Sequence, residues 1–185
     1  MGETLFETQR LIARRWQAGD RAPFAALNGD PEVMRFFPAP LTPAESDAMI
    51  DGIESRMRED GFGFPAIERK ADGVFVGMVG LAPVRFAAAF APAVEIGWRI
   101  ARPLWRQGYA REAALGALAY GFGSLGLDEI VSFTAVQNAP SQGVMASIGM
   151  TRDPTDDFDH PNLPAGHPLR RHVLYRITKA AWAPA

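Results

Sequence analysis

The sequence of 185 residues contains no cysteine. That absence excludes disulfide bonds, a thiol nucleophile and thiolate ligands for a metal. Long apolar runs are absent too, because nowhere do about 18 apolar residues stand together, as a membrane-spanning helix requires. The opening MGETLFETQRLIARRW lacks the apolar run of a signal peptide, and Gly2 is not followed by the Ser or Thr of a myristoylation signal. We therefore expect a cytoplasmic protein with no membrane partner.

A strong net charge is also lacking. The chain has 19 Lys and Arg against 21 Asp and Glu, a formal charge of −2, so we expect no nucleic-acid partner. The three histidines, His160, His167 and His172, do not have the spacing of a zinc site, and no metal is expected. With 48% hydrophobic residues, the length suits one domain, residues 1–185, with a sizeable core.

Apolar patterning predicts alternating strands and helices. The predicted strands cover residues 10–16, 63–69, 74–84, 89–100, 129–136, 150–158 and 172–178. Short helical pieces are expected within 21–37, and longer helices at 42–60, 111–122 and 140–149. The clearest helix start has Thr42 as N-cap, Pro43 at the first helical position and Glu45 completing a capping box. A turn at Ala71-Asp72-Gly73 predicts a hairpin. This order indicates a mixed sheet with helices on its faces.

The segment RPLWRQGYAREAALGALAYGF, residues 102–122, places a basic turn with a glycine between a strand and a helix. A helix N-terminus leaves four backbone N–H groups without partners and carries partial positive charge. Gly108 would let an anion approach that backbone, and Arg106 and Arg111 add fixed charge, so a pyrophosphate fits the turn. The alternative is an ordinary connector whose arginines are merely solvated.

A second glycine pattern, GFGSLG at residues 121–126, matches G-x-G-x-x-G by letter. A dinucleotide-binding motif follows a strand and opens a helix, whereas this one ends a helix and precedes a strand. We interpret it as a helix C-terminus and turn. No G-x-x-x-x-G-K-[ST] motif is present to indicate nucleotide hydrolysis.

Residues 94–150 resemble the GNAT superfamily of acyl-CoA N-acyltransferases, especially the branch with the ribosomal-protein N-terminal acetyltransferases. In that branch an E-I-G-[WY] strand precedes a W-G-x-G-[YF]-A-x-E-A loop and helix, and N-x-x-S-x-x-[VL]-x-x-x-x-G-[FM] follows. The matching positions are Glu95, Ile96, Gly97, Trp98, Trp105, Gly108, Tyr109, Ala110, Glu112, Ala113, Asn138, Ser141, Val144, Gly149 and Met150. Arg106 replaces the first loop glycine, so this turn must tolerate a side chain there.

The resemblance implies an α/β (α+β) fold: a mixed, mostly antiparallel sheet of about seven strands, with a splayed parallel pair and helices on both faces. Acetyl-CoA would lie between strands 94–100 and 129–136, with its pyrophosphate on the N–H groups of the turn and its pantetheine arm paired with the exposed backbone of residues 98–100. Asn138 would bond the pantetheine amides, although Asn before Ala-Pro is also a normal turn residue. The implied acetyl-CoA-binding residues are Trp98, Arg99, Ile100, Arg106, Gln107, Gly108, Tyr109, Ala110, Arg111, Asn138 and Ser141.

Two catalytic residues are candidates. Direct attack by a neutral amine requires a proton acceptor, and Glu95 is the first choice, unless it makes only a structural hydrogen bond. The tyrosine that many family members use to protonate the leaving thiolate is Met145 here. Ser141 is the best remaining hydroxyl, unless it merely caps a short helix.

We expect the early helices, residues 24–60, and the late loop to form the walls of the acceptor site, and the late loop offers other polar side chains. Asp157, Asp159 and His160 could bind a cationic acceptor or supply the base, or could simply be solvated. Phe86 and Phe90, in RFAAAFAPA, could be exposed and face a second subunit of a homodimer. The sequence thus predicts an N-acetyltransferase acting on a small-molecule amine or a protein N-terminus. The alternative, motivated by Met145, is a domain that binds acyl-CoA as a sensor or interaction module without catalysis.

Overall fold

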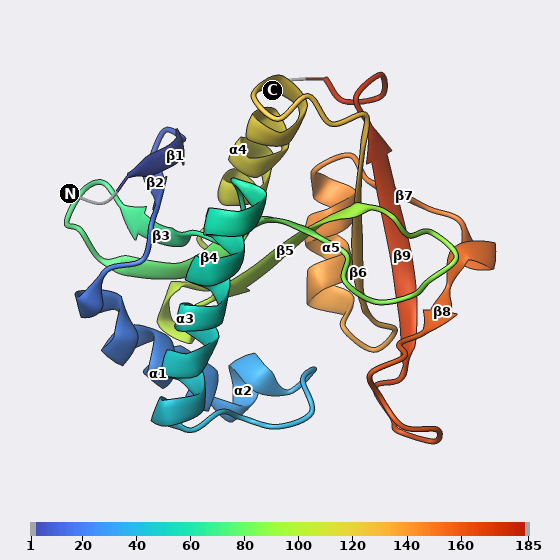
Figure 1. Ribbon diagram of the computed structural model, residues 1–185, viewed down its shortest axis with the longest axis horizontal. Helices are drawn as coiled ribbons and strands as arrows, with labels where there is room; N and C mark the ends of the chain where they lie inside the picture. Colours follow the sequence, from blue (N-terminus) through green and yellow to red (C-terminus); the bar gives the residue numbers. More distant parts are fainter. Residues whose placement is uncertain (1–2, 184–185) are drawn as a thin grey trace.

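The computed structural model describes residues 3–183, and its centre is a twisted sheet of nine strands (Figure 1). Their order is β1-β2-β3-β4-β5-β6-β9-β7, and β8 also pairs with β9. The strands are β1 (Thr4–Glu7), β2 (Leu11–Arg14), β3 (Ala66–Arg69), β4 (Phe75–Pro83), β5 (Val94–Ile100), β6 (Glu129–Ala135), β7 (Thr151–Arg152), β8 (Phe158–Asp159) and β9 (Arg171–Thr178). Every pair is antiparallel except β5 with β6. The expected mixed, mostly antiparallel sheet is confirmed.

Helices cover both faces of this sheet. They are α1 (Arg21–Gly29), α2 (Pro31–Met34), α3 (Pro43–Asp60), α4 (Tyr109–Gly123) and α5 (Ala139–Ser147), with 3₁₀ turns η1 (Ala18–Asp20), η2 (Arg102–Leu104) and η3 (Pro154–Asp156). One buried cluster joins α4 and Met145 of α5 to the sheet, and a second joins α1 and α3 to the other face. None of the helices in the described part of the chain has the length and apolar character to cross a bilayer.

Local sequence signals explain how several elements begin and end. The Thr42 hydroxyl accepts from the Glu45 N–H, the Glu45 carboxylate accepts from the Thr42 N–H, and α3 ends at Gly61 in the left-handed conformation. The β3–β4 hairpin turns at Gly73, whose φ is 71°. The segment 121–126 contains the end of α4 and the turn after it, so the helix-terminus interpretation of GFGSLG is confirmed.

Three strand predictions differ from the structure. Strand β1 was not predicted, because its four residues show too short a pattern; it pairs only with β2. The segment 89–93 lies outside the sheet, since β5 begins at Val94. The predicted strand 150–158 is split by η3, where Pro154 lacks an N–H and the Asp153 carboxylate instead accepts from the Thr155 N–H.

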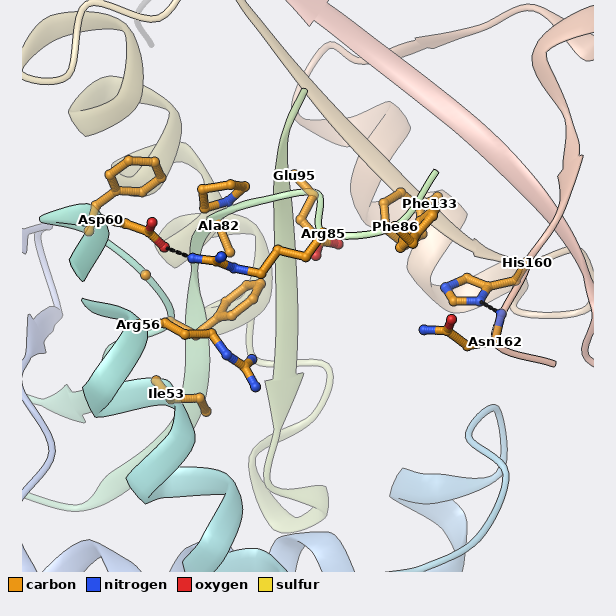
Figure 2. A pocket seen from close by; sticks show the side chains of 14 residues that line it. Ile53, Arg56, Asp60, Ala82, Arg85, Phe86, Glu95, Phe133, His160 and Asn162 are labelled. Atoms are coloured by element: carbon orange, nitrogen blue, oxygen red, sulfur yellow. Dashed lines mark hydrogen bonds and ion pairs between the residues drawn. The ribbon is translucent and has the colours of Figure 1, made fainter. Parts of the chain in front are cut away.

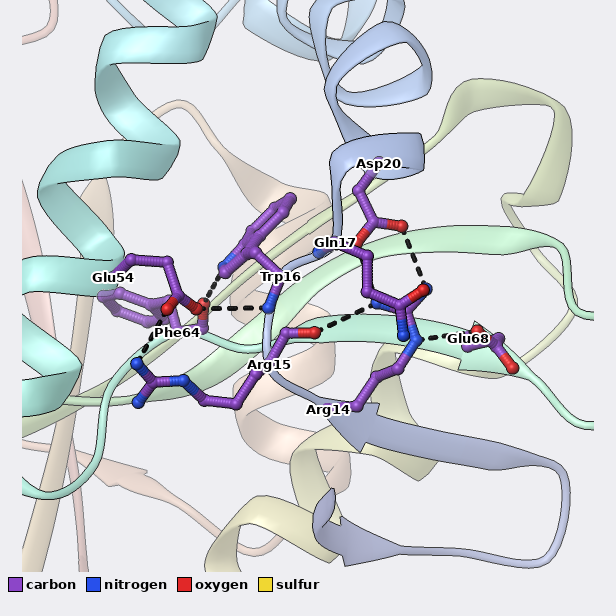
Figure 3. Close-up of polar contacts among 8 residues, drawn as sticks. All are labelled: Arg14, Arg15, Trp16, Gln17, Asp20, Glu54, Phe64 and Glu68. Atoms are coloured by element: carbon purple, nitrogen blue, oxygen red, sulfur yellow. Dashed lines mark hydrogen bonds and ion pairs between the residues drawn. The ribbon is translucent and has the colours of Figure 1, made fainter. Parts of the chain in front are cut away.

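A polar network joins β2 to the neighbouring elements of the α1–α3 face (Figure 3). The buried Arg14 guanidinium contacts Asp20 and Glu68, each at 2.7 Å, and these carboxylates raise the pKa of Arg14. Arg15 pairs with Glu54 of α3 at 2.7 Å, and the Glu54 carboxylate also accepts from the Trp16 N–H. The network therefore holds α3 against the sheet, next to the cavity described below.

Candidate active site

The parallel strands β5 and β6 separate from each other along their length (Figure 1). Strand β5 pairs with β4 throughout, from Val94 to Ile100, but only Glu95 is in register with β6, opposite Val131. Just beyond this pair, the Ser132 hydroxyl donates to the Ile96 carbonyl at 2.9 Å. The β6-facing edge of β5 is therefore open after Ile96, and a cavity of about 1090 Å³ lies along it.

The turn after β5 presents unpaired backbone donors to this cavity. Between residues 3 and 183, the backbone N–H groups of 106–111 find no hydrogen-bond acceptor, and no side chain caps α4. Gly108, the N-cap, has a φ of 82°, and Arg106 has a φ of 60°. Arg106 is the one non-glycine residue with positive φ in the described chain. It occupies the position that the sequence pattern assigns to glycine, so the backbone conformation is retained despite the side chain.

Residues from the first hairpin brace this turn. Arg10 forms an ion pair with Glu112 at 2.5 Å, donates to the Gln107 carbonyl at 3.1 Å and lies over the Tyr109 ring at 4.6 Å. Trp105 Nε1 donates to the Ile100 carbonyl at 2.7 Å, which takes up one backbone acceptor of β5. The turn is thus fixed with its N–H groups free, as an anion site at a helix N-terminus requires. The open donors and the positive charge of Arg106 and Arg111 fit a pyrophosphate.

Glu95 lies on the face of β5 that looks toward α3, in an adjoining cavity of about 270 Å³ (Figure 2). Alternation along the strand places Ile96 and Ile100 in the cluster with α4, and the side chains of 95, 97 and 99 on the opposite face. Burial disfavours the charged carboxylate and raises the pKa of Glu95 to about 7. A carboxylate with this pKa can exchange a proton near neutral pH.

Ser141, Asn138 and Met145 have different roles in α5. The Asn138 side chain is the N-cap: it accepts from the Ser141 N–H at 3.3 Å and donates to the Thr134 hydroxyl at 2.9 Å. Ser141 is not the cap, and its hydroxyl has no hydrogen-bond partner among residues 3–183. Asn138 and Ser141 line the large cavity, whereas Met145 is buried in the α4 cluster.

The late loop contributes one of its three candidate residues to the cavities. His160 lines both, and burial, together with His172, lowers its pKa. Asp157 is instead paired with Arg152, which lowers the pKa of Asp157, and Asp159 pairs with Arg170 at 3.3 Å. Neither aspartate lines either of these two cavities. No cluster of three or more residues able to hold a metal occurs between residues 3 and 183.

Phe86 and Phe90 are not the exposed pair that the sequence suggested. Both are half-buried, and their rings lie 5.5 Å and 5.9 Å from Phe133 of β6. They also pack against Phe158, which pairs with β9. The segment between β4 and β5 therefore folds over its own sheet, and these phenylalanines are contacts within the chain.

Residues of the early helical segment, 24–60, which the sequence predicts to form one wall of the acceptor site, complete the large cavity. They include Phe37, Met49, Ile53 and Arg56. Arg99, expected to contribute its backbone, also turns its side chain to this face and contacts Asn28 of α1. The sequence gives one indication of this side-chain contact: Arg99 is a charged residue in GWRI, the otherwise apolar end of β5.

Comparison with known proteins matches residues 10–151 to the family model described as "Acetyltransferase (GNAT) domain". The chain is 34% identical, over 84% of its length and 68% of the relative, to FsC-acetyl coenzyme A-N(2)-transacetylase of Aspergillus fumigatus. A solved GNAT-family acetyltransferase from Bacillus anthracis shares the fold with a TM-score of 0.79 and 23% identity, covering 95% of this chain and 98% of that one. Spermidine N-acetyltransferase from Vibrio cholerae, solved with CoA and spermine, has a TM-score of 0.73 and 19% identity over 93% and 95% of the two chains.

Proposed function

Because the chain belongs to the GNAT family of acetyltransferases, we propose that it transfers the acetyl group of acetyl-CoA directly to the primary amine of a small molecule or a protein N-terminus. We propose that residues 1–185 form a single acyltransferase domain. The observation that carries the proposal is Glu95, a carboxylate with a pKa of about 7, at the point where β5 and β6 separate.

Acetyl-CoA supplies the activated acetyl group as a thioester. The N–H groups of residues 106–111, with Arg106 and Arg111, bind its pyrophosphate, because they are unpaired donors at the positive end of α4. The open edge of β5 at residues 98–100 binds the pantetheine arm, and Asn138 and Ser141 line the opposite wall. A backbone N–H of this edge stabilises the carbonyl oxygen as negative charge develops on it.

The chemistry requires two proton movements. The acceptor nitrogen forms a bond to the acetyl carbon as the carbon–sulfur bond breaks, and the amine proton passes to Glu95, directly or through a water. The departing thiolate takes a proton from the Ser141 hydroxyl, which solvent then restores. The acceptor enters from the α3 side, because Glu95 faces that side.

A direct test is acceptor-dependent release of CoA. The purified protein is mixed with acetyl-CoA and a panel of amines, and free CoA is measured with a thiol reagent, to which the cysteine-free chain contributes no background. We expect CoA release to depend on both enzyme and amine, with the N-acetylated amine as product. The alternative, a domain that binds acyl-CoA without catalysis, predicts binding of acetyl-CoA with no release for any amine.

Replacing Ser141 with alanine is expected to lower kcat by about 10- to 100-fold, as for a lost general acid. Stability and acetyl-CoA affinity should change little, because Asn138 caps α5 and the Ser141 hydroxyl bonds to nothing among the described residues. The matched control is Ser147→Ala on the same helix, where the hydroxyl bonds only the Val144 carbonyl and lines neither cavity. A loss of thermal stability with unchanged kcat would contradict the acid role of Ser141.

A further inference from the structure

Arg99 is a buried cation that has no carboxylate partner among residues 3–183. The residue is 8% exposed, and its Nη1 donates to Asn28 Oδ1 and lies 3.8 Å from the Met49 sulfur. The Phe37 ring lies 4.2 Å from its Cζ. In the chain from residue 3 to 183 no carboxylate lies within ion-pair distance of Arg99; Nε is buried without a partner, and no acceptor is found for Nη2.

A second buried arginine shows what a purely structural guanidinium looks like in this fold. Arg14, 7% exposed, is paired with both Asp20 and Glu68, which raise its pKa. Arg99 is equally buried, but desolvation lowers its pKa to about 10, so it is charged at neutral pH and uncompensated. Burying an unpaired charge is costly, and a counter-ion removes much of that cost. The missing partner of Arg99 is therefore an anion that the cavity admits.

The position of Arg99 places that anion beside the reacting groups. Arg99 and Glu95 lie on the same face of β5, four residues apart, and both line the large cavity. Gly97 lies between them, and a Cβ there would come within 3.2 Å of the Phe64 ring, so the floor between the two charges carries no side chain. A molecule held by Arg99 thus extends along this floor toward Glu95.

Positive side chains outnumber negative ones in the lining of the large cavity, where Glu32 and Glu95 are the acidic residues. Arg56 of α3 extends below Glu95 (Figure 2) and forms no ion pair within the described residues. Arg35 and Arg102 also line the cavity, and their ion pairs with Glu32 and Asp30 are long, at 3.7 Å and 3.9 Å. Glu95 is largely neutral below pH 7 because of its raised pKa. The surroundings favour an acceptor with a negative group and disfavour one with a second positive group.

We propose that Arg99 binds a carboxylate of the acceptor, so that the substrate class of this enzyme is an amine that also carries a carboxylate, as an amino acid does. This inference rests on the proposed acetyl transfer. The planar guanidinium group can donate two parallel N–H···O hydrogen bonds to the two oxygens of a carboxylate. Asn28 and Met49 occupy Nη1 and Phe37 covers one face, which leaves the Nη2 edge to a single carboxylate.

Matched acceptors test the proposal on the unmodified enzyme. Alanine, 3-aminopropanoate, 4-aminobutanoate and 6-aminohexanoate are each compared with the corresponding amide, and spermidine serves as the polycation. We expect at least one acid to exceed its amide about tenfold or more in kcat/KM, and spermidine to be poor. Amides as good as acids in every pair would overturn the inference while leaving acetyl transfer intact; no acetylation of any amine would instead count against the proposed function.

A variant then assigns the preference to Arg99. Arg99→Met should raise KM for the preferred acid by about 10- to 100-fold. The kinetics of its amide and the acetyl-CoA thermal shift should change far less, because residue 99 contacts the pantetheine arm through its backbone, which methionine retains. Because Arg99 forms no ion pair among residues 3–183, its replacement leaves no carboxylate buried without a partner there, so the variant should fold. Arg58→Met, on α3 outside both cavities, is the control.

Inhibition of the wild type gives a readout that needs no variant. Butanoate, which lacks an amine, should compete with the acceptor, and butanamide should not. Equal loss of acid and amide turnover in Arg99→Met, or equal inhibition by butanoate and butanamide, would show that Arg99 serves only the structure.

Discussion

Replacing Glu95 with glutamine is expected to lower kcat/KM about 100- to 10,000-fold near neutral pH, the range for a lost general base. An aliphatic ammonium has a pKa of about 10.4, so at pH 7 few acceptor molecules carry a free lone pair. The carboxylate must take the proton as nitrogen attacks, and a glutamine amide cannot. The measurement is a pH–rate profile of wild type and Glu95→Gln with one acceptor.

The shape of the profile follows from the direction of the pKa shift. Burial raises the pKa of Glu95 to about 7, so the base is protonated and inactive below this pH and becomes available as pH rises through 7. Wild type should show a bend near pH 7 that the variant lacks. The gap between them should narrow at high pH, where free amine is abundant. An equal loss at every pH would indicate a positional role for Glu95.

Reduced folding stability would not explain the expected fall in kcat/KM of the Glu95→Gln variant. A carboxyl group whose pKa is raised by folding stabilises the folded state below its unfolded pKa and loses that contribution as pH rises through 7. Glutamine stays neutral, so the variant should be at least as stable as wild type above pH 7. The control is Asp60→Asn: Asp60 lines the same small cavity but is paired with Arg85 at 2.6 Å. If Glu95→Gln retained full activity, His160 would be the next base to test, since Asp157 and Asp159 line neither cavity.

The sequence predicts the parts of the fold that depend on neighbouring residues. The capping box at Thr42 and the turn at Gly73 are each set within a few residues. The sequence also predicts that the turn after β5 opens α4, because a strand, a glycine and an alanine-rich helix follow each other directly.

The acceptor side could not be predicted in the same way. Asn28 contacts Arg99 across 71 positions of the chain, and no local pattern connects the two. Phe86 looks exposed in RFAAAFAPA, because the rings that cover it, Phe133 and Phe158, come from β6 and β8. These contacts depend on how separate elements pack. The unexpected buried charge is nevertheless visible in GWRI as a departure from the apolar pattern of β5.

Replacing Gly108 with valine is expected to abolish stabilisation by acetyl-CoA. At 100 times its Kd, a ligand stabilises the folded state by about 2.7 kcal/mol, which gives a clear rise in Tm for wild type. Gly108 has a φ of 82° and opens onto the unpaired N–H groups of residues 106–111. A β-branched side chain there would stand where the pyrophosphate approaches, 3.4 Å from Arg10 already at its Cβ. The measurement is the thermal shift with and without acetyl-CoA.

Backbone strain has to be separated from loss of the anion site, because valine is unfavourable at positive φ wherever it is placed. Gly126→Val provides the match: Gly126 has a φ of 68°, a Cβ added there would meet nothing within 4 Å, and its turn beyond α4 lines neither cavity. Both variants should lose stability without ligand, and only Gly108→Val should also lose the shift. If Gly108→Val kept the full shift, acetyl-CoA would not use these N–H groups, and the positive end of α4 would be only a connector.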